Sequence, residues 1–236
     1  MVPDPERVAS WRAMLSEALT EVQALVHARA NYERFAALVR GNKHVLHGES
    51  EFPVHVQRWF SHFAAMSIRR IVEPNDSGDI VSLRSVLDEM IRAASAFTSE
   101  SIAELFDAPD SPRYDAELKA FLITSMWENV SYPGGAQEQL DAKMLKHDRR
   151  MLELVSGEIK DMVDKTIAHH VSHTEEYTLL YPELSTCIDV IEAIALRYQA
   201  PLLGPSMSTL VPTDLSNWFD IFARNWLYEE PKTNES

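Results

Sequence analysis

Apolar residues recur every three or four positions along most of the chain, a spacing typical of amphipathic helices with one buried face. Between Pro5 and Arg40 the sequence is rich in good helix formers and nearly free of helix breakers. Its apolar stripe consists of Trp11, Leu15, Ala18, Leu19, Val22, Leu25 and Val26. The pattern predicts a first long helix that ends near Gly41-Asn42.

A second helix is expected to have Pro53 in its first turn and to end at about Val72, before Pro74. The stripe expected to face the core is Val56, Trp59, Phe60, Phe63, Ala64 and Ile71. After the turn cluster PNDSGD, Ser82 is placed to cap a third helix, SLRSVLDEMIRAA.

Further helical patterns cover about 115–127, 136–171 and 182–198, the last stopped before Pro201. A terminal helix, TDLSNWFDIFARNWL, spans 213–227. Its aromatic stripe, Trp218, Phe219, Phe222 and Trp226, leaves two interpretations open, core packing or contact with a second subunit. We expect an all-α antiparallel helical bundle in one domain, with the bundle over about 5–200 and a Pro-rich loop, a helix and a frayed tail over 201–236.

Composition and charge limit the classes of function. Only seven glycines occur, which argues against an all-β plan and a Gly-rich phosphate loop. Twenty-two Lys and Arg against 36 Asp and Glu give a net charge of −14, which disfavours DNA and anionic membrane as partners. The single Cys187 lies on an apolar stripe, where a buried, inert thiol is expected. No leader or membrane-spanning run is evident, so the expected location is the cytoplasm.

The 136–171 pattern carries the candidate chemistry. Leu152, Val155, Ile159, Met162, Thr166, His169 and His173 follow one another at alternating spacings of three and four, so all seven share one stripe. The imidazoles of His169 and His173 therefore extend the apolar stripe. One interpretation is a core histidine whose nitrogens are satisfied by a neighbouring carbonyl or carboxylate; the other is a functional imidazole in a crevice.

The run Asp164-Lys165-Thr166-Ile167-Ala168-His169 resembles the signature of the HEPN superfamily, which is commonly Arg, Asn or Asp, Lys, two variable residues, Ala and His. Upstream, SIRRIVEPNDSGDIVSLRSVL places an Arg at the end of an aromatic-rich helix, then an acidic turn, then Ser-Leu. The two together resemble the branch related to abortive-infection AbiU-type phage-resistance proteins.

This resemblance implies a HEPN-like bundle and a homodimer, in which active members cut RNA without metal or cofactor. His169 matches the motif histidine, while Asp164 and Lys165 match the polar and lysine positions. The motif arginine is replaced by Val163, and Lys165 lies about 200° around the helix from it. Arg69 or Arg70 could supply the cation from the second helix, and Arg70 is the candidate carried forward.

The leading hypothesis is therefore a prokaryotic defence or stress-associated homodimer that is catalytically degenerate or only binds a partner. An active metal-independent RNase that uses His169 with Lys165 or Arg70, and a purely structural protein-interaction module, are the alternatives.

Metal binding is the weaker interpretation of the histidines. His169 and His173 stand at i and i+4, a spacing that zinc sites use, but the HExxH order is absent. His44, His47, His55 and His62 form no further ligand pattern. No metal and no cofactor is expected.

Overall fold

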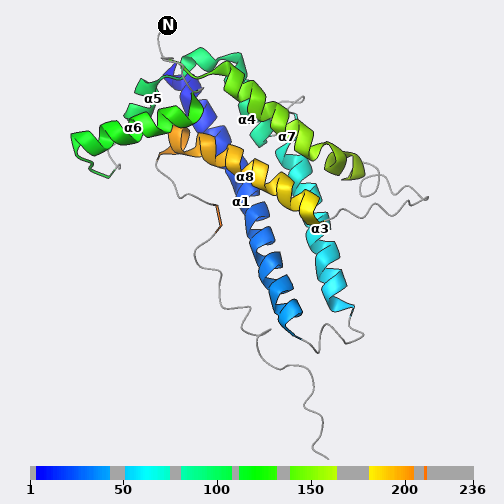
Figure 1. Ribbon diagram of the computed structural model, residues 1–236. Helices are drawn as coiled ribbons and strands as arrows, with labels where there is room; N and C mark the ends of the chain where they lie inside the picture. The colour runs from blue at the N-terminus through cyan, green and yellow to red at the C-terminus, as the bar shows by residue number, and fades with distance from the viewer. Residues whose placement is uncertain are drawn as a thin grey trace, which may run out of the picture.

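The computed structural model describes residues 4–42, 51–74, 81–107, 112–131, 139–163, 181–204 and 210–211. These residues form an all-α bundle with no strand among them, which confirms the predicted fold class (Figure 1). The elements are α1 (Pro5–Gly41), α3 (Phe52–Ile71), α4 (Leu83–Arg92), the 3₁₀ turn η1 (Ala94–Ala96), α5 (Ser99–Asp107), α6 (Ala116–Val130), α7 (Ala142–Met162) and α8 (Tyr181–Leu203).

Helix α1 organises the bundle. The Asp4 side chain caps it by accepting from the Arg7 N–H at 3.1 Å, and Asn42 is its C-cap, as the sequence predicts. Its 37 residues span about 55 Å at 1.5 Å per residue. Helices α3 and α8 make its most extensive contacts: α3 runs beside it and α8 crosses it (Figure 1).

The remaining helices extend this frame. Ser82 and Ser85 form a capping box at the start of α4, which confirms the predicted cap. Helix α7 packs on α4, α8 and α3, while α5 and α6 lie at the end of the bundle where α1 begins (Figure 1).

The buried apolar side chains of the described residues form one connected cluster. Trp11, Phe97 and Tyr198 are among its largest fully buried members. Cys187 is also fully buried there, as predicted, and burial raises the pKa of its thiol to about 12. Within the described ranges, no helix combines the length and the apolar character needed to cross a bilayer.

The start of α7 differs from the prediction. The helix begins at Ala142, capped by Asp141, whose carboxylate accepts from the Lys143 N–H at 2.7 Å. Just before it, the Leu140 N–H donates to the Phe97 carbonyl at 3.1 Å. This contact between distant segments holds the backbone out of the helix, so the predicted start at 136 was wrong.

The end of α8 also differs. The helix continues through Pro201 to Leu203 instead of stopping before the proline. One lost backbone donor is tolerable this close to a helix end. Gly204, at φ +100, closes the helix with its N–H on the Ala200 carbonyl at 2.9 Å.

The predicted core stripe of α3 is only partly buried. Phe60, Ala64 and Ile71 are buried as expected. Trp59 and Phe63, however, are 64% and 41% exposed, so their assignment to the core was wrong.

Candidate functional site

The candidate residues of the long helix fall outside the described part of the chain. These are Asp164, Lys165 and His169, together with the weak metal candidate His173. The aromatic stripe Trp218, Phe219, Phe222 and Trp226 also lies outside it. The structure does describe Val163, at the first position of the motif, and Arg70, the candidate cation.

Val163 stands where the HEPN-like motif has its arginine. Its backbone is helical, with φ −58 and ψ −47, and its N–H donates to the carbonyls of Ile159 and Lys160. Its side chain is 1% exposed and belongs to the hydrophobic cluster. This position therefore faces the core, where an arginine would lose its hydration.

Arg70 lies near the C-terminal end of α3 and is already paired. Its Nε donates to the Glu21 carboxylate on α1 at 3.2 Å, and its Nη2 contacts the same oxygen. The pair is partly exposed, so Arg70 is held against α1 by a surface ion pair of modest strength.

A buried polar cluster that the sequence analysis missed joins α7 to α8. Asp148 is 2% exposed and accepts from the Tyr198 hydroxyl at 2.7 Å and from the Arg197 guanidinium. Burial, followed by the charge of Asp148, raises the pKa of Tyr198 well above its ordinary value. Burial alone would lower the pKa of Arg197, but hydrogen bonding to Asp148 raises it overall.

One sequence signal for this cluster existed. Asp148 lies between Leu145 and Leu152 on the apolar stripe of α7, and an acid on a buried stripe demands a partner. Each carboxylate oxygen of Asp148 accepts from one donor on α8, Oδ1 from Arg197 and Oδ2 from Tyr198, so the cluster is suited to holding two helices together.

A second cluster joins α1 to α8. Arg29 donates to the Ser185 carbonyl at 3.4 Å, to the Asp189 carboxylate and to Glu192 Oε2 at 3.0 Å. The other oxygen of Glu192 accepts the Leu210 backbone N–H at 2.9 Å. The cluster therefore also positions the chain that follows α8.

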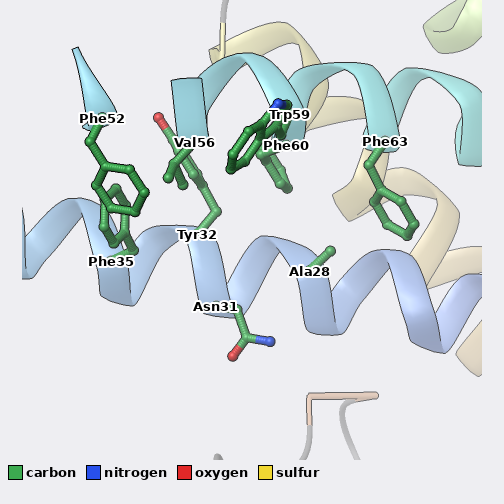
Figure 2. Close-up of a pocket in the computed structure, with 9 residues that line it drawn as sticks. All are labelled: Ala28, Asn31, Tyr32, Phe35, Phe52, Val56, Trp59, Phe60 and Phe63. Atoms are coloured by element: carbon green, nitrogen blue, oxygen red, sulfur yellow. The ribbon is translucent and has the colours of Figure 1, made fainter. Parts of the chain in front are cut away.

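An open apolar groove lies between α1 and α3 (Figure 2), with a volume of about 360 Å³. We call it the aromatic groove; its lining residues are Ala28, Asn31, Tyr32, Phe35, Phe52, Val56, Trp59, Phe60 and Phe63. Tyr32 and Phe60 stack with ring centroids 4.4 Å apart and planes 5° apart, and Tyr181 of α8 lies against Tyr32 at 5.2 Å. The structure offers here a concave surface that can bind an apolar partner.

Metal binding finds no support in the part of the chain that the structure describes, since no group of three or more His, Cys, Asp or Glu side chains is arranged to hold an ion there. His55 instead lies 3.6 Å from Glu51 and stacks near Trp59. His44 and His47 lie outside the described residues.

No protein-family model, no curated protein and no solved structure matches this chain.

Proposed function

We propose that this chain is a HEPN-like helical protein of prokaryotic defence or stress response that works by binding, as a homodimer, and has lost RNA cleavage. The observation that carries the loss of catalysis is the buried position of Val163. The family assignment rests on the resemblance of residues 164–169 to the HEPN signature.

Cleavage of RNA by an imidazole without metal needs a cation near the phosphate, because negative charge develops on its oxygens during the reaction. Val163 supplies neither charge nor hydrogen bonds, and its side chain points into the core. Arg70 already neutralises Glu21. The net charge of −14 also works against retention of a polyanion. These features support a protein that binds a partner over one that cuts RNA.

Incubation of the full chain with total RNA in the presence of EDTA tests this proposal. The variants are His169→Ala and a matched control, His147→Ala, which changes an exposed histidine of α7. We expect the unmodified protein and both variants to leave RNA intact. Cleavage that disappears only in His169→Ala would establish the alternative, an active RNase.

The homodimer is tested separately by the solution mass from light scattering. We expect a mass twice that of the chain at micromolar concentration. A strictly monomeric protein would contradict this part of the proposal.

A structural interaction module without any defence role is the second candidate, and the aromatic groove is the observation that favours it. A phage-challenge assay separates the two functions. Protection that is lost in His169→Ala and kept in His147→Ala would disfavour a purely structural role, whereas no protection in any variant would favour it.

A further inference from the structure

Large aromatic side chains, which a helical bundle normally buries, are exposed in the aromatic groove. Trp59 and Phe63 lie on the same helix as Ala64 and Ile68, which are fully buried. Exposed aromatic rings gathered around one hollow are uncommon on a protein surface and mark a binding site. The stacked rings of Tyr32 and Phe60 form the floor of the groove, whereas Trp59 and Phe63 on its α3 side remain exposed.

The described chain ends across α1 from this groove. The Leu210 N–H is held by Glu192, and Glu192 is held by Arg29, the neighbour of the groove residue Ala28. In Figure 2 the pale orange segment of residues 210–211 lies on the side of α1 away from α3, and Asn31 points away from α3 as well. The last described residues, 210–211, are therefore separated from the groove by the width of α1.

Asn31 supplies an independent polar observation. Its side-chain oxygen is buried and accepts no hydrogen bond from any residue that the structure describes. A buried acceptor without a donor costs about 1–3 kcal/mol. Asn31 therefore shows that polar groups on the α1 side of the groove lack a partner among the described residues.

The sequence of 213–227 matches these requirements. It predicts an amphipathic helix whose apolar stripe consists of Trp218, Phe219, Phe222 and Trp226. From 218 to 226 such a helix rises about 12 Å, close to the rise of about 10 Å along α1 from Ala28 to Phe35. With residues 213–217 helical, the chain from Val211 to Trp218 reaches about 14 Å, slightly more than the diameter of about 10–12 Å that an α-helix has with its side chains.

We infer that the aromatic stripe of residues 213–227 docks in the aromatic groove of the same chain and covers Trp59 and Phe63. The segment acts as a third helix on the α1–α3 pair, so the groove is a site for this intramolecular partner. This inference is independent of the proposed HEPN-like function, but a groove filled from within the chain no longer supports the second candidate, the structural interaction module.

Disulfide cross-linking of the full chain tests the inference. The native Cys187 should not compete for disulfide formation, because it is buried and the pKa of its thiol is raised to about 12. The test pair is Val56→Cys with Phe222→Cys. The matched control replaces Phe222→Cys by Asp220→Cys, which lies about 160° away on the predicted helix.

We expect the test pair to form an intrachain disulfide in most molecules, at a yield independent of protein concentration and at least 10-fold above the control pair. Mass spectrometry of a non-reduced digest identifies the bond. Absence of the disulfide, equal yields in the two pairs, or a disulfide-linked dimer would overturn the inference, the last result identifying a second copy as the occupant.

Trypsin cleavage after Arg224 provides a second measurement without engineered cysteines. Phe63→Glu places a charge in the groove and should accelerate this cleavage by 10-fold or more. The matched control, Phe121→Glu, changes an aromatic side chain of α6 that is 66% exposed and should leave the rate unchanged. Equal cleavage rates in both variants and the unmodified protein would also overturn the inference.

Discussion

Replacing Asp148 with alanine removes the acceptor at the centre of the polar cluster between α7 and α8. The carboxylate is nearly inaccessible to water, with 2% of the residue exposed. Its two donors, the Arg197 guanidinium and the Tyr198 hydroxyl at 2.7 Å, remain in place after the substitution. Both then lose this acceptor, the Tyr198 hydroxyl at a buried site and the Arg197 guanidinium at a partly exposed one.

The expected loss is large because the penalty falls on the groups left behind. Breaking a buried ion pair by removing one partner costs about 3–5 kcal/mol. Arg197 is partly exposed and recovers some hydration, while the fully buried Tyr198 hydroxyl loses its only described acceptor. We therefore expect a decrease of about 3–4 kcal/mol in the free energy of unfolding. This is a substantial fraction of the roughly 5–15 kcal/mol that stabilises a typical protein.

Urea unfolding followed by circular dichroism at 222 nm measures this loss. With a slope of about 2–3 kcal/mol per molar urea, the midpoint should fall by about 1–2 M at unchanged slope. The matched control is Asp107→Ala, because Asp107 also pairs with a cation, Lys119, but its side chain is 68% exposed. That variant should lose at most about 1 kcal/mol.

A second variant, Tyr198→Phe, removes one donor and keeps the ion pair, so it should lose about 1 kcal/mol. The reasoning is refuted if Asp148→Ala loses no more than Asp107→Ala while the slope stays the same. In that case the cluster contributes no more than a surface ion pair.

Three further predictions concern single positions. Because burial raises the pKa of Cys187 from 9 to about 12, the unfolded thiol ionises first and stability falls as pH rises above 9. Urea unfolding from pH 8 to 11 gives the free energy of unfolding at each pH. Above pH 9, Cys187→Ala should make its decrease with pH shallower by about 1.4 kcal/mol per pH unit. An equally steep decrease in the variant would contradict a thiol that stays protonated in the folded state. Ser82→Ala removes both the cap bond to the Ser85 N–H at 3.0 Å and the bond to the Glu73 carbonyl at 2.6 Å. It should cost about 1–2 kcal/mol in urea unfolding, and a loss below half of that would mean that the cap is dispensable. Arg29→Met should lower the free energy of unfolding by about 2–3 kcal/mol, because the largely buried Glu192 carboxylate loses its cation. An unchanged melting temperature in thermal unfolding would argue against this.

Most helix boundaries follow from local signals in the sequence. Ser82 caps α4, Pro53 lies in the first turn of α3, and the stripe from Trp11 to Val26 is buried along α1. These features depend on residues within one or two turns of one another, so a pattern in the sequence is enough to predict them.

The exceptions have distant causes. The start of α7 depends on the bond between Leu140 and Phe97, which are remote in the sequence. The last turn of α8 is held from α1, where Arg12 donates to the Leu202 carbonyl at 2.9 Å and lets the helix pass Pro201. Nothing in the local pattern encodes either contact.

The candidate site likewise has features that the sequence predicts and features that depend on tertiary packing. The sequence alone singled out residues 164–169, the substitution Val163 and the cation Arg70. That Val163 points into the core, and that Arg70 is bound to Glu21, depends on how α3 and α7 pack in the bundle.

The hydrophobic periodicity of the sequence was enough to predict the helices and the all-α class. This is because the backbone hydrogen bonds of a helix form within its own segment, so a helix depends on local sequence. Which apolar positions are covered is a different matter, since it depends on whether another element reaches them. The pattern assigned Trp59 and Phe63 to the core on the same grounds as Phe60, yet only packing with α1 and α8 decided that Phe60 is buried and that the other two line an open groove.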